Sequence, residues 1–128
     1  NSEYKENSTV PSANTLREVV GFVKDRAGTG QKALVLPYMA GVYYLSQTIP
    51  PTQYNNILAG FVLDQQEFIN SVNWSQINVV VYDSTNGPMM KNNLLRDYDP
   101  LLHQFILNNY SLVKTTSEGW LLMEKKQS

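Results

Sequence analysis

The chain has 128 residues, 42 % of them hydrophobic and 16 % charged, which suits one folded domain and excludes a disordered segment. Its formal net charge is -1 and it has no long block of basic residues, so we expect no nucleic-acid partner. Cysteine is absent, which excludes disulfides and thiolate metal sites, and no apolar run approaches the roughly 20 residues that span a bilayer.

The start of the chain predicts a linker followed by a helix. Residues 1–13 are polar and lack periodicity, so we interpret them as a leader or linker and residues 14–128 as a single α/β domain. Thr15 and Glu18 have the spacing of a capping box, and apolar residues at helical spacing follow them. The two glycines within residues 27–30 predict the end of this helix.

The middle of the chain alternates short apolar runs with helix signals. The apolar residues 33–36 predict a buried strand, and residues 39–45 predict one or two helical turns. Asp64 and Glu67 have the spacing of a second capping box. They predict a helix that ends near Asn73.

The last part of the chain predicts two further kinds of element. The run 77–82 is apolar and β-branched, as in buried parallel strands, and Asp99 followed by Pro100 predicts the start of a helix. Residues 110–116 and 120–124 predict strands joined by a tight turn. This order of elements predicts an α/β three-layer sandwich, with a small, mostly parallel, Rossmann-like sheet, helices on its faces and a C-terminal antiparallel hairpin.

The sequence contains no recognisable catalytic motif. A P-loop, a dinucleotide fingerprint and a nucleophile elbow are all absent, and His103 has no cysteine or second histidine with which to form a metal site. Asp97 and Asp99 could hold a divalent cation through oxygen ligands, but helix capping by Asp99 explains this pair more simply. We therefore expect no catalytic residue, no metal site and no cofactor in this chain.

Five residues are candidates for ligand binding. Asp83 follows the predicted strand 77–82, and ligands of open α/β sheets gather beyond the carboxyl ends of strands, although a turn would also use Asp there. Four tyrosines surround a double proline, where their rings could stack on sugars, on peptides or at a membrane interface, or could pack in the core. These tyrosines are Tyr38, Tyr43, Tyr44 and Tyr54.

A longer pattern extends over most of residues 15–125. Its segments are Val35-Leu36-Pro37, Tyr43-Tyr44-Leu45-Ser46, Pro50-Pro51-Thr52-Gln53-Tyr54, Gly60-Phe61, Asp64-Gln65-Gln66-Glu67, Val79-Val80-Val81-Tyr82-Asp83, Tyr110-Ser111-Leu112-Val113 and Gly119-Trp120-Leu121-Leu122-Met123-Glu124. In these segments the chain resembles the C-terminal soluble domain of multi-pass membrane glycosyltransferases of the protein-mannosyltransferase and aminoarabinose-transferase type. Members of that family often carry Arg where this chain has Gln47 and Gln53, so the resemblance does not imply that this loop binds phosphate.

The resemblance implies a parent enzyme that moves a sugar from a polyprenyl-phosphate donor to an acceptor on the outer side of the membrane. The catalytic carboxylates of such enzymes belong to loops of the transmembrane part. This chain would then be a non-catalytic accessory domain on the extracytoplasmic face. Its partners would be the transmembrane part of the same polypeptide and a glycan or protein acceptor close to the membrane.

Two other functions also fit the residues. A free-standing α/β enzyme would bind a nucleotide or another small ligand at the carboxyl edge of the sheet, through Asp83 and Tyr38. A protein-interaction module would use the exposed aromatic residues or an edge of the closing hairpin. A ligand-dependent rise in thermal midpoint would indicate the enzyme. Self-association that is lost on Tyr43→Ser plus Tyr44→Ser would indicate the interaction module.

Overall fold

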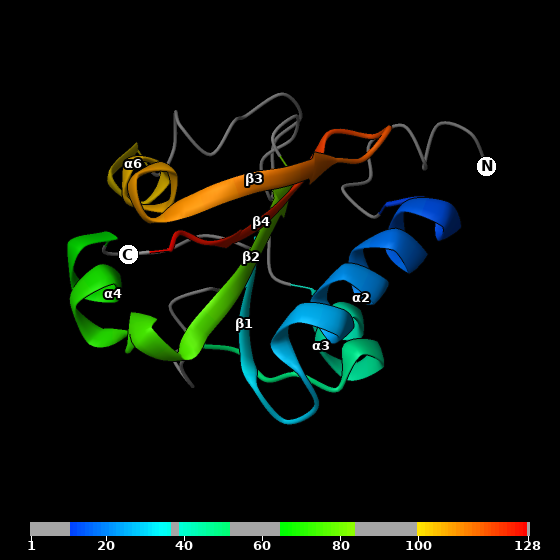
Figure 1. Ribbon diagram of the computed structural model, residues 1–128, viewed down its shortest axis with the longest axis horizontal. Coiled ribbons are helices and arrows are strands. Elements are labelled where there is room, and N and C mark those ends of the chain that lie inside the picture. The colour runs from blue at the N-terminus through cyan, green and yellow to red at the C-terminus, as the bar shows by residue number, and fades with distance from the viewer. Residues whose placement is uncertain (1–10, 37–38, 52–64, 84–99, 128) are drawn as a thin grey trace.

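A four-stranded mixed sheet forms the centre of this computed structural model, which describes residues 11–36, 39–51, 65–83 and 100–127 (Figure 1). In spatial order its strands are β1 (Lys32–Leu36), β2 (Ile77–Asp83), β4 (Trp120–Lys125) and β3 (Tyr110–Thr115). Helices lie on the faces of this open sheet, so the α/β class that the sequence predicts is confirmed.

The sheet is mostly antiparallel, and the prediction of a mostly parallel sheet is therefore wrong. Strands β1 and β2 run parallel, whereas β4 is antiparallel to both of its neighbours, β2 and β3. The sequence places the two closing strands correctly along the chain, but β4 lies beside β2 in the interior of the sheet. The long apolar run of β2 follows from burial on both faces rather than from two parallel neighbours.

Alternate residues of β2 contribute to different cores. Val79 and Val81 belong to the cluster on one face of the sheet, and Val80 and Tyr82 belong to the cluster on the other. This follows from strand geometry, since successive side chains point to opposite faces. All four side chains are almost completely buried, so β2 stabilises both layers of helices.

Helices α2 (Ala13–Ala27) and α3 (Ala40–Ser46) cover one face of the sheet (Figure 1). Val19 and Val23 are four residues apart, which puts them on the same side of α2. Both are fully buried in a cluster that also contains Trp120 of β4. The predicted first helix and the predicted turns after residue 39 are confirmed.

Helices α4 (Gln65–Ser71) and α6 (Pro100–Asn109) cover the opposite face. Phe68 of α4 and Leu102 of α6 are fully buried there. Helix α4 ends at Ser71, slightly earlier than predicted, and a short 3-10 helix, η2 (Trp74–Gln76), leads into β2.

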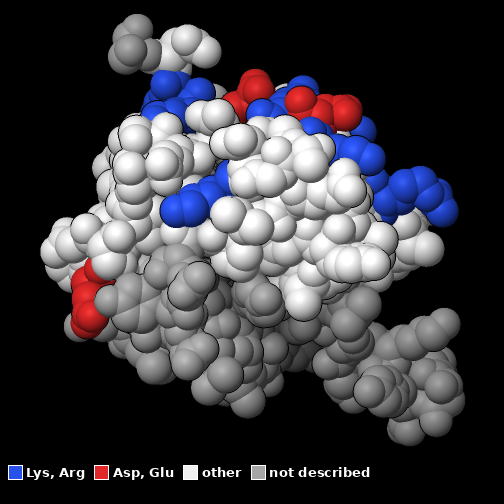
Figure 2. Space-filling view, turned by 90° about the horizontal axis from the view of Figure 1, so that it is seen from below, with Lys and Arg blue, Asp and Glu red and all other residues white. Residues whose placement is uncertain are grey.

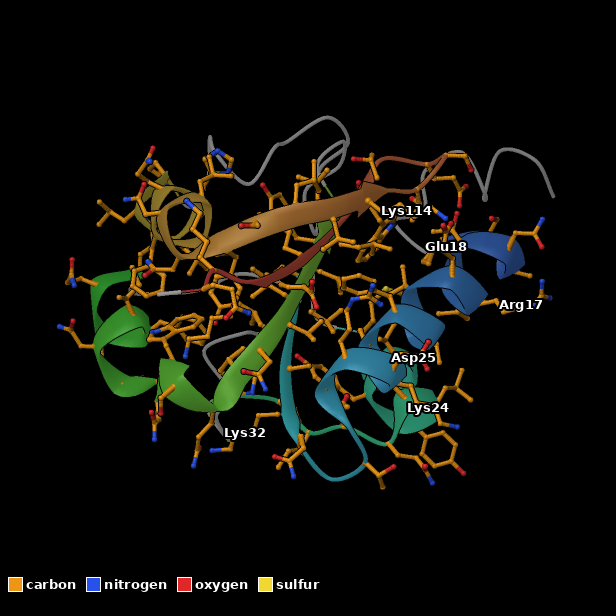
Figure 3. The ribbon with its side chains drawn as sticks, in the orientation of Figure 1. Arg17, Glu18, Lys24, Asp25, Lys32 and Lys114 are labelled. Atoms are coloured by element: carbon orange, nitrogen blue, oxygen red, sulfur yellow. The ribbon has the colours of Figure 1, made fainter. Side chains whose placement is uncertain are left out.

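The first helix begins before the capping box that the sequence predicts. The Ser12 side chain accepts a hydrogen bond from the Thr15 backbone N–H at 3.3 Å, so Ser12 is the N-cap and the Thr15 and Glu18 box is wrong. Glu18 instead forms an ion pair with Lys114 of β3, and the two side chains point toward one another in Figure 3. The Ser12 backbone N–H also donates to Glu118 at 2.9 Å. Ser12, which we assigned to the linker, is therefore tied to the folded part.

Helix α6 is capped by a side chain from another helix. The Gln65 side-chain oxygen accepts hydrogen bonds from the backbone N–H groups of Leu101 and Leu102, at 2.7 and 3.2 Å. These N–H groups belong to the first turn, where no partner exists inside the helix. Asp64 and Asp99, the caps that the sequence predicts for α4 and α6, lie outside the described residues.

Candidate functional site

The structure separates the two neighbouring tyrosines of α3. Tyr43 has 5 % of its surface exposed and Tyr44 has 82 % exposed. Adjacent residues of a helix point about 100° apart, so one side of α3 can face the core while the other faces solvent. Of the other predicted tyrosines, Tyr38 and Tyr54 lie outside the described residues.

Tyr43 has a structural contact in the core. Its hydroxyl oxygen accepts a hydrogen bond from the Val35 backbone N–H at 2.9 Å, and both atoms are buried. Val35 belongs to β1, which lies at an edge of the sheet. The hydroxyl therefore satisfies an N–H group that would otherwise need a neighbouring strand.

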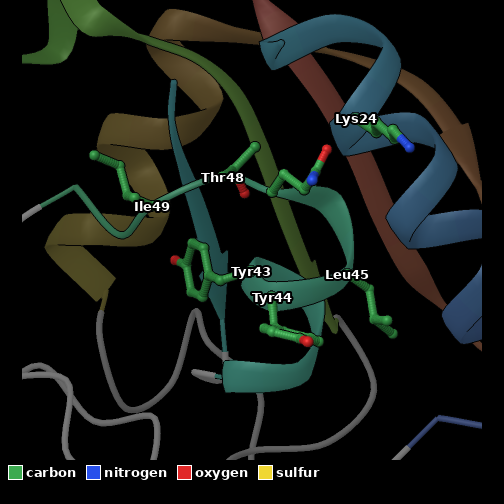
Figure 4. A pocket seen from close by; sticks show the side chains of 7 residues that line it. Lys24, Tyr43, Tyr44, Leu45, Thr48 and Ile49 are labelled. Atoms are coloured by element: carbon green, nitrogen blue, oxygen red, sulfur yellow. The ribbon is translucent and has the colours of Figure 1, made fainter. Parts of the chain in front are cut away.

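Tyr44 belongs to an exposed apolar area, which we call the α3 surface. We define it by Lys24, Tyr44, Leu45, Gln47 and Ile49. These residues line an open hollow of about 620 Å³ between the end of α2 and the end of α3 (Figure 4). Three of the side chains, Tyr44, Leu45 and Ile49, are large, apolar and exposed. Such a group of side chains marks a contact surface more often than it marks a catalytic centre.

The turn that shapes the α3 surface is held in an unusual conformation. Gln47 ends α3 with a φ of 60° and a ψ of 36°, in the left-handed region that costs residues other than glycine about 1 kcal/mol or more. Two hydrogen bonds support this turn: the buried Ser46 and Thr48 hydroxyls lie 2.7 Å apart, and the Gly30 backbone N–H donates to the Gln47 carbonyl at 2.7 Å. These bonds hold the turn that connects Tyr44 to Ile49.

Few charges lie at the α3 surface. Of the described residues that line its hollow, only Lys24 is charged. Lys24 and its neighbour Asp25 lie on α2, and Lys32 lies at the start of β1 (Figure 3). Seen from below, the molecule shows a broad area of uncharged side chains, with basic and acidic side chains along its upper border and a basic side chain within it (Figure 2). The long alkyl stem of Lys24 can lie along apolar surface while its ammonium group stays in water.

Asp83, the fifth predicted site residue, is not among the residues that line the hollow of the α3 surface. It ends β2, is paired in register with Trp120 of β4, and has 4 % of its surface exposed. The loop that follows it, residues 84–99, is outside the described part of the chain. The same holds for Asp97 and Asp99, the pair that we considered for a cation. Tyr43 and Tyr44 line the hollow of the α3 surface, and Asp83 does not.

His103 packs beside an aromatic ring of β2. Its ring and that of Tyr82 meet edge to face, with their centroids 6.2 Å apart. Burial raises the pKa of Tyr82 above its ordinary value. Both residues belong to the side of the sheet that α6 covers, opposite to α3. His103 is half-buried at this position.

A second hollow, of about 410 Å³ and polar, was not predicted. It is lined by residues from α2, β2 and the end of β4. Arg26 of α2 pairs there with Glu124 of β4 at 3.2 Å, and its guanidinium group lies 4.2 Å from the ring centre of Phe22. These residues are far apart in the sequence and form no local motif, so only the fold brings them together. Because Arg26 is already engaged by a carboxylate and an aromatic ring, it is poorly placed to hold an anion.

Among the described residues, no group of three or more His, Cys, Asp or Glu side chains could hold a metal ion. None of the described helices combines the length and the apolar character needed to cross a membrane. A scan against models of protein families found no match, and neither did searches of curated proteins and of solved structures.

Proposed function

We propose that this chain is a non-catalytic accessory domain of a membrane glycosyltransferase that uses a polyprenyl-phosphate sugar donor. In this proposal the domain is a three-layer α/β sandwich on the extracytoplasmic face of the cell membrane. The α3 surface contacts the transmembrane part of the same polypeptide and helps to present a glycan or protein acceptor. Catalysis belongs to the transmembrane part.

The observation that carries the proposal is the exposure of Tyr44 next to Leu45 and Ile49. An amphipathic tyrosine with aliphatic neighbours suits a surface that is partly apolar and partly wet, as a protein contact near a bilayer is. Lys24 at the border adds a positive charge that fits the lipid phosphates close by.

The resemblance in the sequence supports the same assignment. Tyr43, Tyr44 and Leu45 belong to the second segment of that pattern. In the structure Tyr43 is buried, whereas Tyr44 and Leu45 are exposed. Tyr43 serves the core, so the outward-facing Tyr44 is left to act as the contact residue. The carboxylate candidate Asp83 is buried and does not line the hollow of the α3 surface, where Lys24 is the one charged residue among the described lining residues, so no carboxylate is placed there for acid or base catalysis.

The first test is the coding sequence upstream of Asn1. Several apolar segments of about 20 residues each are expected there. An open reading frame without such segments would refute the proposal. The purified chain is also expected to show no glycosyl transfer or hydrolysis with polyprenyl-phosphate sugars, and turnover by the isolated chain would equally refute it.

The second test locates the contact in the full-length protein. A photo-crosslinking amino acid at Tyr44 should join the domain to the transmembrane part after irradiation in membranes. The same amino acid at Leu107, an exposed residue of α6 on the other side of the sheet, is the matched control. Crosslinking at Leu107 but not at Tyr44 would show that a different surface faces the enzyme.

A further inference from the structure

The two outer edges of the sheet, at β1 and at β3, differ in how far their backbone groups are hydrogen-bonded. At β1 the outward-pointing N–H groups are occupied: Ala33 donates to the Ile49 carbonyl at 3.0 Å, and Val35 donates to the Tyr43 hydroxyl at 2.9 Å. Ile49 also donates to the Gln31 carbonyl at 2.9 Å, which forms a short bridge along that edge. The β1 edge is therefore closed to any further strand.

At the β3 edge the described residues provide no further strand. Strand β3 pairs with β4 on one side, and no hydrogen bond joins its outer edge to another part of the described chain. All residues from Ser111 to Thr115 are exposed, and Leu112 has 54 % of its surface in contact with solvent. An exposed edge with apolar side chains is a template for pairing with another strand.

We propose that β3 pairs with β3 of a second copy of this chain. The two strands associate antiparallel about a two-fold axis and join two four-stranded sheets into one continuous sheet. The occupant must offer an open edge of its own, and among the described strands β3 is the one that has it. This inference does not depend on the proposed function, because α3 lies by the opposite edge of the sheet.

The charge pattern of β3 permits self-pairing. Its single charged residue, Lys114, is already paired with Glu18 of α2. In a pairing centred on Leu112, Lys114 lies opposite Tyr110 of the second copy, so like charges do not meet. The apolar Leu112 side chains come together at the axis and are removed from water.

A bulge limits the length of the new ladder. The register of β3 against β4 shifts between Leu112 and Lys114, so that Val113 is the extra residue. The shift places Leu112 opposite Met123, on the face that α6 covers, and Lys114 opposite Leu122, on the face that α2 covers. Because bulges interrupt pairing, the dimer is expected to be weak and to depend on concentration.

The experiment is sedimentation equilibrium of the purified chain from about 1 µM to about 1 mM, the range over which a weak dimer would form. The wild-type chain should shift from monomer to dimer, and Leu112→Lys should raise the dissociation constant at least about tenfold, because two ammonium groups then meet at the axis. Leu45→Lys is the matched control, since Leu45 has 49 % of its surface exposed but lies on α3. Its self-association should equal that of the wild type.

Hydrogen exchange of the wild-type chain tests the same contact without any variant. Backbone amides within Ser111–Thr115 should exchange more slowly as the concentration rises, while exposed amides of α3 should not change. A chain that stays monomeric at every concentration would overturn the proposal. So would a dimer that survives Leu112→Lys, or one that is lost in Leu45→Lys.

Discussion

Replacing Tyr43 by Phe removes one oxygen atom and keeps the ring in the core. The hydroxyl accepts the Val35 backbone N–H at 2.9 Å in a buried environment, so the variant leaves that N–H without this partner. An unsatisfied buried donor costs about 1 to 3 kcal/mol, more than the net value of an ordinary hydrogen bond. For a domain of this size, each kcal/mol lowers the thermal midpoint by roughly 4 °C. We expect Tyr43→Phe to lower it by about 4 to 12 °C.

The assay is thermal and urea denaturation followed by circular dichroism. If the unfolding free energy depends on urea concentration as steeply in the variant as in the wild type, the two proteins have the same folded state. The adjacent residue supplies the control, because Tyr44 has 82 % of its surface exposed and Tyr44→Phe removes the same atom. That variant should unfold within about 0.5 kcal/mol of the wild type. Equal stability of the two variants would refute the structural role that we assign to the Tyr43 hydroxyl.

Three further predictions concern pH and capping. Hydrogen bonds from the Thr15 side chain, and then from Ser12, lower the pKa of Glu118 from its ordinary value of 4.5. The stability that Glu118 contributes is therefore present above pH 4.5 and is lost as the pH falls through the lowered pKa. Glu118→Gln should reduce this loss of stability at acid pH in unfolding measurements made over a pH series. Burial raises the pKa of Tyr110 above its ordinary value of 10, so the stability that Tyr110 contributes is full below pH 10 and falls as the pH rises further. Near-ultraviolet absorbance should show this tyrosine ionising only as the chain unfolds. Tyr110→Phe should reduce the loss of stability at alkaline pH. Gln65→Ala removes the acceptor for two N–H groups at the start of α6 and should cost about 1 kcal/mol in urea denaturation, whereas Gln65→Glu should retain most of the cap.

The local elements of this fold follow closely from the sequence. The apolar run that begins at Ile77 forms β2, and the turn with Gly119 at a φ of 89° joins the two closing strands. These signals are short-range, because strand propensity and turn chemistry act within a few residues. The start of α2 was less predictable, since Ser12 and Thr15 are both good N-caps and the contact of Glu18 with distant Lys114 favours the earlier one.

The arrangement of the sheet could not be read in the same way. Whether β4 pairs with β2 or stays at the edge depends on which apolar surfaces are buried together over long sequence separations. The alternation of helices and strands favours parallel pairing and says nothing about the insertion of a closing strand.

The candidate site shows a similar limit. Tyr43 and Tyr44 are chemically identical in the sequence, and only the rotation of the seven-residue helix α3 decides which one faces the core. Lys24 was missed because it reaches the α3 surface from α2, and Ile49 because a single aliphatic residue beside the double proline carries no binding signal of its own. In the sequence, the feature that comes closest to indicating the α3 surface is Ile49 directly after the turn with the two hydroxyl residues Ser46 and Thr48.

The interior position of β4 has a consequence for synthesis on the ribosome. The strand that separates β2 from β3 is β4, which follows the other three described strands in the sequence and so leaves the ribosome after them. Until then β2 has an open apolar edge on its antiparallel side, and β3 has no partner. The sheet therefore stays incomplete until β4 has emerged, which makes products that stall or are truncated before β4 prone to aggregation and a target for chaperones.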